Sequence, residues 1–115
     1  MAQETVFSKI ISGEIPVTKL AETERVLAFP DINPQARVHI LVIPKTSEYE
    51  NLTELAAGDP ELLAEMVETA QKLADEHADG QYRGIFNSGE KAGQTVFHVH
   101  MHVLAGDLEE RGLVG

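Results

Sequence analysis

Six residues, His98-Val99-His100-Met101-His102-Val103, place three of the chain's five histidines at alternate positions. Two residues is the period of a β-strand, whose successive side chains point to opposite faces. The three imidazoles are therefore expected to share one face, while the valines and the methionine point into a core. Histidine is a poor strand former and costs free energy when buried without partners, so packing does not explain this row. The row is a candidate functional site, because imidazole acts as nucleophile, proton carrier or metal ligand near neutral pH.

The elements predicted around this row indicate an α+β fold, with an antiparallel sheet of about five strands, one long helix and one short N-terminal helix. The short helix starts at Val6 after the N-cap Thr5 and ends at Gly13. The long helix follows Asp59-Pro60 and ends before Gly80. Its apolar stripe comprises Leu62, Leu63, Met66, Val67, Ala70, Leu73 and Ala74. The predicted strands are Val26–Phe29, Val38–Ile43, Tyr82–Asn87 and the histidine strand Val96–Leu104, and the tail after Ala105 is expected at the surface.

Length and composition limit what the chain can be. A chain of 115 residues forms one domain, residues 1–115, with a single core. It has no cysteine, which excludes a disulfide scaffold and a cysteine zinc site, and no long apolar run, so a cytoplasmic protein without a membrane partner is expected. A net charge of -10 repels nucleic acid polymers. A small phosphate ligand remains compatible, because a few local donors suffice to bind one.

Two chemistries fit the histidine row. The preceding Ala92-Gly93-Gln94-Thr95 combines small residues with backbone, amide and hydroxyl donors, which suits an oxyanion, although these are also common turn residues. One possibility is zinc, because His-x-His is a metal-ligand spacing and His39 or His102 could be a third ligand. The other is covalent phosphoryl chemistry, in which one histidine attacks phosphorus, the others hold oxygens or pass a proton, and the loop stabilises charge.

The segment Gly93-Gln94-Thr95-Val96-Phe97-His98-Val99-His100-Met101-His102-Val103-Leu104 resembles the signature of the histidine-triad (HIT) family. The similarity extends over nearly the whole chain. Four further segments are similar to the Hint branch, the purine nucleotide-binding members: residues 6–16, 28–36, 39–45 and 82–89. This resemblance implies hydrolysis of purine nucleoside phosphoramidates and a homodimer joined along the long helix and the strand Tyr82–Asn87. Because the chain has no cysteine and no carboxylate next to the histidines in sequence, we expect no required metal or cofactor.

The resemblance also implies a role for each histidine of the site. His100 corresponds to the nucleophile that attacks the α-phosphorus and forms a nucleotidyl-histidine. His98 corresponds to the residue that orients it, partly through its backbone carbonyl. His102 corresponds to a phosphate contact and member of a proton relay, and His39 to a fourth histidine that reaches in from the neighbouring strand.

The remaining implied residues bind the nucleotide. Asp31 resembles the carboxylate that binds the ribose hydroxyls, although the residues alone favour a turn-capping role over ribose binding. The base pocket is implied for Phe7, Ile10, Phe29 and Leu41, with Ile32 beside Asp31, and the phosphate side for Asn87, Gly93, Gln94, Thr95 and Val96. Residues 106–115 lack the tryptophan of the eukaryotic Hint tail, so no leaving-group contact is carried over there.

Two other functions remain open at this point. A dinucleoside polyphosphate hydrolase of the Fhit type shares Ala-Gly-Gln-Thr-Val before the triad, but Asn87-Ser88-Gly89 and the short chain argue against it. A nucleotide- or zinc-binding signalling module would hydrolyse its ligand only incidentally. Activity that survives removal of metal would separate that module from the hydrolase.

Overall fold

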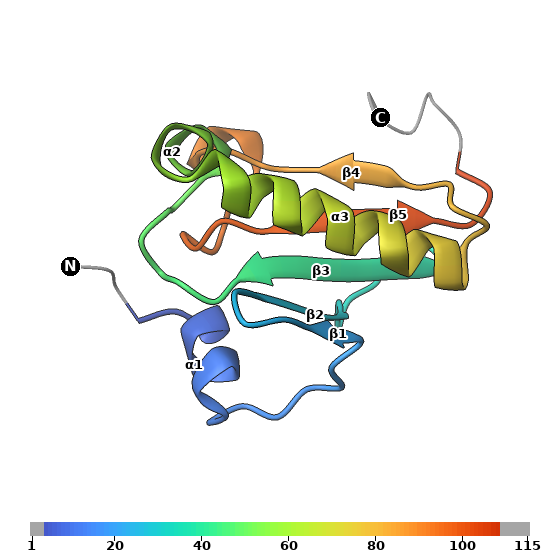
Figure 1. Cartoon of the computed structure of the whole chain (residues 1–115), viewed down its shortest axis with the longest axis horizontal. Helices are drawn as coiled ribbons and strands as arrows, with labels where there is room; N and C mark the ends of the chain where they lie inside the picture. Colours follow the sequence, from blue (N-terminus) through green and yellow to red (C-terminus); the bar gives the residue numbers. More distant parts are fainter. Residues whose placement is uncertain (1–3, 109–115) are drawn as a thin grey trace.

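The computed structural model of the protein describes residues 4–108 and shows an α+β fold built on one antiparallel sheet (Figure 1). The order of its five strands is β1-β2-β3-β5-β4. The strands are β1 (Ala21–Glu22), β2 (Val26–Pro30), β3 (Val38–Pro44), β4 (Arg83–Ile85) and β5 (Met101–Ala105). The helices are α1 (Val6–Ser12), α2 (Leu52–Gly58) and α3 (Pro60–His77), and a 3-10 turn, η1, covers Glu90–Ala92. The predicted fold class is therefore confirmed.

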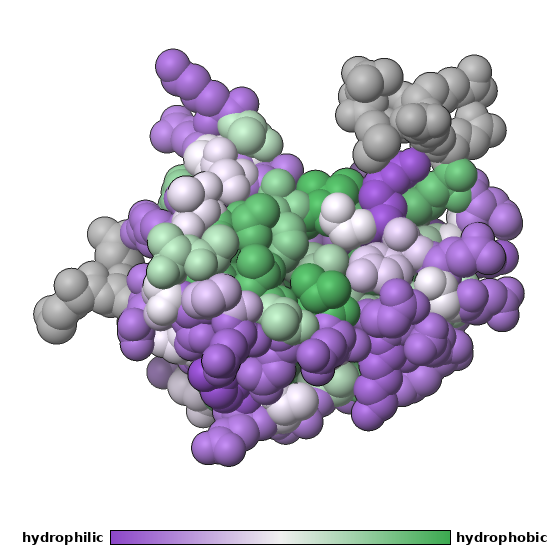
Figure 2. Space-filling view, turned by 45° about the horizontal axis from the view of Figure 1, so that its top comes forward, coloured by the Kyte–Doolittle hydropathy of each residue, from purple (hydrophilic) through white to green (hydrophobic). Residues whose placement is uncertain are grey.

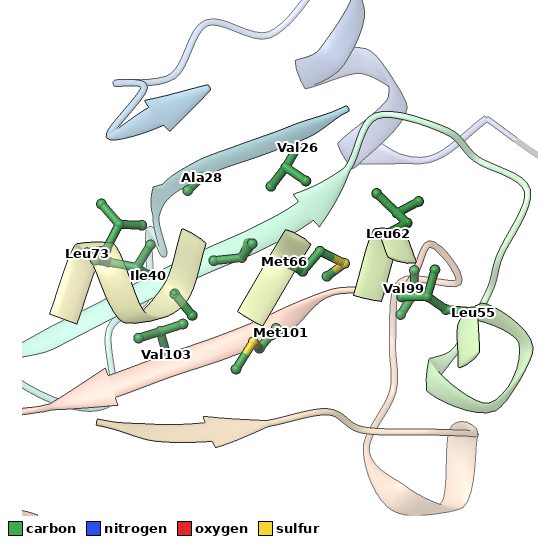
Figure 3. Close-up of a cluster of buried hydrophobic side chains, with 12 residues drawn as sticks. Val26, Ala28, Ile40, Leu55, Leu62, Met66, Leu73, Val99, Met101 and Val103 are labelled. Atoms are coloured by element: carbon green, nitrogen blue, oxygen red, sulfur yellow. The ribbon is translucent and has the colours of Figure 1, made fainter. Parts of the chain in front are cut away.

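Helix α3 lies across one face of the sheet and forms the main core with it (Figure 1, Figure 3). Asp59 begins the helix by accepting a hydrogen bond from the backbone N–H of Leu62 at 3.1 Å, and Pro60 occupies its first turn. Residues of alternating parity on three strands meet the apolar side of α3. The buried members of this core are Val26, Ala28, Ile40, Val42, Leu55, Leu62, Met66, Ala70, Leu73, Val99, Met101 and Val103.

The opposite face of the sheet carries a smaller core under α1. Thr5 and Ser8 form a capping box at the start of α1, and Gly13 ends the helix with a left-handed φ of 89°. The buried members of this second core are Phe7, Ile10, Leu27, Phe29, Leu41 and Ile43. Because Leu41 pairs with His102 in the β3–β5 register, this is also the face on which the histidines of the sheet lie.

The histidine strand is shorter than predicted. It begins at Met101 rather than Val96, so His98 and His100 precede the paired part of the sheet. In the observed register, residue 99 would oppose Pro44, and proline has no N–H to continue the ladder. The carbonyl of Pro44 is instead taken by the imidazole of His98, at 2.8 Å. A side-chain bond therefore replaces a ladder bond at this point.

Other predicted bounds also needed correction. The strand predicted over Tyr82–Asn87 pairs only over Arg83–Ile85, although it is an edge of the sheet as predicted. Val67 was placed in the apolar stripe of the long helix, but its side chain is 40% exposed because it lies beside the buried row. Strand β1, helix α2 and η1 were not predicted.

Two further observations concern the termini and the membrane. Residues 106–108 are partly or fully exposed, in agreement with a surface position, and the rest of the tail lies outside the described residues. Within residues 4–108, no helix has both the length and the apolar character needed to cross a bilayer.

Candidate active site

The alternation predicted for the histidine row persists where the sheet pairing does not. Val99, Met101 and Val103 are all buried in the core under α3. The imidazoles of His100 and His102 lie on the other side, with ring centroids 5.1 Å apart. One short segment therefore serves two faces, an apolar one and a histidine-bearing one.

His100 has a fixed tautomer. Its Nδ1 lies 2.8 Å from the backbone carbonyl of His98, and because a carbonyl oxygen only accepts, Nδ1 must carry the hydrogen. In the neutral ring, Nε2 then has a free lone pair. Burial lowers the pKa of His100, so the neutral form is the stable one at pH 7. The edge contact with Phe7, at a centroid distance of 4.9 Å, packs the ring on its apolar side.

His39 and His102 are joined by a hydrogen bond whose donor and acceptor can also be assigned. The backbone N–H of Gln35 donates to Nδ1 of His39 at 2.9 Å, so Nε2 of His39 carries its hydrogen. That Nε2–H donates to Nδ1 of His102, also at 2.9 Å. The hydrogen of neutral His102 is therefore on Nε2. Burial, followed by the neighbouring His100 and His39, lowers the pKa of His102 to about 4.

Asp31 lies at the end of this histidine pair. Its Oδ2 is 3.4 Å from Nε2 of His39, and its Oδ1 accepts from the backbone N–H of Asn33 at 2.8 Å. The turn-capping role is thus present, and a carboxylate also faces the histidines. Asp31, His39 and His102 offer ligand atoms that all lie within 4.8 Å of one another, which makes them the group within residues 4–108 that could hold a metal ion.

His98 supports the site from behind. It is 1% exposed, and its Nε2–H donates to the carbonyl of Pro44 at 2.8 Å. Its Nδ1 has no hydrogen-bond partner among the described residues. Burial lowers its pKa as well, because a charged ring would be poorly solvated there. The imidazole fixes the backbone, whose carbonyl in turn fixes His100.

A cavity of about 440 Å³ opens in front of these rings. One side is apolar and comes from α1, β2 and β3, and the other side carries the histidines, Asp31 and the loop before β5. The lining residues are Val6, Phe7, Ile10, Ile15, Pro16, Val17, Phe29, Pro30, Asp31, Ile32, Leu41, Thr95, Val96, His100 and His102. Its volume and its apolar lining with few polar groups are typical of a small-molecule site.

The structure brings most of the predicted site residues to this cavity. Phe7, Ile10, Phe29 and Leu41 line it and also belong to the second core, so they serve both packing and the pocket. Ile32 stands at its mouth and is 97% exposed. Five predicted residues do not line the cavity: His39, His98, Asn87, Gly93 and Gln94.

Those five residues differ in where they lie. His39 and His98 act on cavity residues through the hydrogen bonds described above. Gly93 is exposed and has a φ of 94°, a left-handed conformation that its turn requires of a glycine. Gln94 is buried, and its side chain is bonded to the backbone. Asn87 is half-buried, and its assignment to the phosphate side stays a prediction.

Sequence reasoning implied the orienting carbonyl of His98, but it missed two other backbone groups of the site and part of the cavity wall. The N–H of Gln35 and the carbonyl of Pro44 fix two imidazoles, yet neither has a side-chain signature. The segment after α1, Ile15-Pro16-Val17, lines the cavity and was not assigned. An apolar Ile-Pro-Val run directly after a helix stop was the available signal, because such a run favours packing over solvation.

The chain was compared with known proteins. The family model described as "Scavenger mRNA decapping enzyme C-term binding" matches residues 4–114. An uncharacterised HIT-like protein of Synechocystis is 46% identical over 110 residues, covering 92% of this chain and 93% of that protein. A purine nucleoside phosphoramidase of Escherichia coli is 42% identical over 108 residues, covering 92% and 90%. The structure of a HIT family hydrolase from Clostridium thermocellum has a TM-score of 0.87 at 43% identity, covering 95% and 96%.

Proposed function

The chain belongs to the histidine-triad family of hydrolases, and from that premise we propose that it hydrolyses purine nucleoside phosphoramidates through a nucleotidyl intermediate on His100. The observation that carries the proposal is the bond between Nδ1 of His100 and the carbonyl of His98. It leaves the Nε2 lone pair available at the cavity, in a ring that burial keeps neutral. A neutral imidazole with a defined free nitrogen is the state a nucleophile needs.

His102 is placed to donate a hydrogen bond to the phosphate, because it presents Nε2–H at the same cavity as His100. Attack by Nε2 of His100 on phosphorus forms the P–N bond to the enzyme and breaks the P–N bond to the amine. Since neutral His102 would become an imidazolate if it gave up this hydrogen, the departing nitrogen takes its proton from water, which leaves a hydroxide. In the second step, water attacks phosphorus, the bond to Nε2 of His100 breaks, and the proton of the attacking water neutralises the hydroxide, so that the nucleoside monophosphate and free His100 are released.

The lining of the cavity is consistent with binding of a purine ribonucleotide. Its apolar wall suits the face of a large aromatic base, and the carboxylate of Asp31 can accept hydrogen bonds from two vicinal hydroxyls. The net charge of -10 disfavours a polynucleotide. The name of the Escherichia coli relative agrees with this substrate class. A chain without cysteine also suits the reducing cytoplasm, where we place the reaction.

A quenched reaction followed by mass analysis tests the mechanism. Wild-type protein mixed with adenosine phosphoramidate and quenched in base should carry one nucleotidyl group on His100, because the P–N bond of such an adduct survives base. An adduct on another residue would overturn the assignment. Specificity constants for adenosine phosphoramidate, cytidine phosphoramidate and diadenosine triphosphate then test the substrate. A preference for the triphosphate would favour the dinucleoside polyphosphate reading, and equal use of cytidine would discredit the purine pocket.

The cluster of Asp31, His39 and His102 favours a second candidate, a zinc-binding module. Two imidazole nitrogens and a carboxylate are ligands that zinc accepts, and bound zinc would act as a Lewis acid. The observed tautomers disfavour it, because Nε2 of His39 uses its hydrogen to bind His102 and would have to lose it to coordinate. Exhaustive chelation is expected to leave activity intact. Loss of activity on chelation, with recovery in proportion to added zinc, would favour the module.

We also propose a homodimer formed across the β4 edge and the neighbouring side of α3. Among residues 4–108, strand β4 pairs with another strand on one side only, and Val67 on α3 is 40% exposed. Figure 2 shows an apolar area in the middle of the face that includes these two elements, bordered by hydrophilic residues. Unpaired edges and apolar patches are commonly covered in small proteins. Light scattering at micromolar concentration should give twice the chain mass, and a monomer mass would refute the proposal.

A further inference from the structure

The segment that carries His98 and His100 is attached to the rest of the protein in an unusual way. Residues 94–100 precede β5 and belong to no strand. The backbone N–H of Val99 donates to the carbonyl of Tyr49 at 3.0 Å, and the imidazole of His98 donates to the carbonyl of Pro44 at 2.8 Å. Both acceptors belong to residues 44–50, which comprise the last residue of β3 and the loop that follows it. These residues, which we call the support loop, therefore hold the segment in place of a neighbouring strand.

Gln94 provides the third attachment to the support loop. Its side-chain nitrogen donates to the carbonyl of Glu50 and, at 3.0 Å, to the carbonyl of Val96. The first of these bonds is 2.6 Å long. Its side-chain oxygen accepts from the backbone N–H of Gly89 at 2.8 Å. Both amide hydrogens are used, and the side chain is 3% exposed, so it has neither a free donor nor access to the cavity.

From these contacts we infer that Gln94 is a positioning residue that fixes residues 94–98 on the support loop and does not touch the substrate. This differs from the phosphate contact implied by family resemblance, and it rests on the proposed function. Thr95 and Val96, which follow Gln94 directly, line the cavity. Two residues further on, the carbonyl of His98 sets the ring of His100. A displacement at Gln94 therefore reaches both the loop beside the phosphate and the nucleophile.

The expected consequence is a loss of turnover with little loss of binding. Misplacing a reacting group by about 1 Å can cost on the order of 100-fold in rate, whereas binding depends mainly on the apolar wall from α1, β2 and β3, to which Gln94 is not hydrogen-bonded. Gln94→Ala removes all three bonds. Gln94→Glu keeps the size and the acceptor for Gly89, but it turns a carboxylate oxygen toward two carbonyl oxygens. Both variants should lower kcat about 10- to 100-fold and change the Kd of adenosine monophosphate less than about threefold.

The matched control is Lys91→Ala, an exposed residue in η1 of the same loop, which should leave kcat and Kd unchanged. Melting temperatures are measured first, and if Gln94→Ala is unfolded at the assay temperature, Gln94→Glu is judged by the same criteria. Nucleotide binding weakened tenfold or more in the folded variant would show a direct contact and overturn the inference. An unchanged kcat would overturn it as well.

An NMR measurement separates this inference from the proposed function. The ring Cε1–Hε1 signals of His98 and His100 should shift in both Gln94 variants, while the exposed His77 at the end of α3 serves as the unshifted reference. If the wild-type protein does not hydrolyse phosphoramidates, the proposed function fails, yet these signals still report on the positioning. Unshifted His98 and His100 signals would overturn the role of Gln94 and leave the hydrolase proposal intact.

Discussion

The two faces of the sheet are built from the same strands but differ in what they contain. The face under α3 is packed with apolar side chains from three strands (Figure 3). The face under α1 has half as many buried apolar residues in its core and adds the histidines, Asp31 and a cavity. Polar groups there are buried only where a hydrogen bond fixes them, with Nδ1 of His98 as the exception among the described residues. Stability and chemistry are thus assigned to opposite faces of one layer.

The sharpest way to break this division is to change the nucleophile. His100→Ala should lower kcat more than about a thousandfold, because the covalent step is lost, while nucleotide binding survives. The melting temperature should change little by comparison, since the main core is on the other face. Steady-state kinetics and thermal unfolding measure the two effects. A variant that retains a tenth of wild-type activity would refute the assignment.

The opposite test truncates the face under α3. Met66 is fully buried, and Met66→Ala should lower the free energy of unfolding by about 2 to 5 kcal/mol through lost contacts and a cavity. Denaturant titration measures this loss, and kcat of the folded fraction should stay near the wild-type value. The exposed Lys72→Ala on the same helix is the control for stability, with a loss below about 1 kcal/mol. A collapse of kcat in folded Met66→Ala would show that the faces are not independent.

Asp31→Asn sharpens the comparison within the cavity face. The change keeps the shape but removes the charge that strengthens hydrogen bonds from sugar hydroxyls. Binding of adenosine monophosphate should weaken by about 1 to 3 kcal/mol, and binding of the 2′,3′-dideoxy nucleotide should weaken less. Calorimetric titration with both nucleotides checks this. Equal losses for the two ligands would mean that Asp31 acts as a turn cap, through Asn33, rather than as a ribose contact.

The gentlest test is pH. Burial lowers the pKa of His98 and His100, and that of His102 falls to about 4, all below the usual 6.5. As the pH falls below about 6.5, these histidines become protonated in the unfolded chain while they stay neutral in the native protein. The free energy of unfolding therefore decreases progressively toward pH 4. Above pH 6.5 both states are neutral at these rings and the effect vanishes. Urea titrations between pH 7.5 and 5 should show the decline, and His98→Ala, His100→Ala and His102→Ala should each reduce its slope.

The sequence alone predicted the faces well because alternation and helical spacing are local patterns. His39 and His102 share a face with Leu41 as their parity requires. The prediction failed where the end of a strand depends on a residue that is distant in the sequence. The histidine strand starts late because Pro44 cannot donate, and no feature of residues 96–100 reveals that. Helix α2 was missed because it is short and buries only Leu55.

The site shows the same limit. The residue types that do chemistry were visible in the sequence, and the resemblance implied the backbone carbonyl of His98 as well. The backbone N–H of Gln35 and the carbonyl of Pro44, which orient two further imidazoles, were not visible. A backbone N–H or carbonyl belongs to almost every residue, so only the fold selects the ones that matter. Gln94 was visible as a polar side chain, but its burial against the support loop was not.

The strict alternation between His98 and Val103 has a consequence for how a gene of this kind can change. A substitution alters one face and spares the other. Inserting or deleting a single codon within these six would reverse the alternation on one side of the change, turning imidazoles there toward α3 and apolar side chains toward the cavity, so that one event would damage both the core and the chemistry. Length variation is therefore unfavourable in this segment, whereas the exposed turn at Lys91 and Ala92, upstream of His98, has room to absorb it.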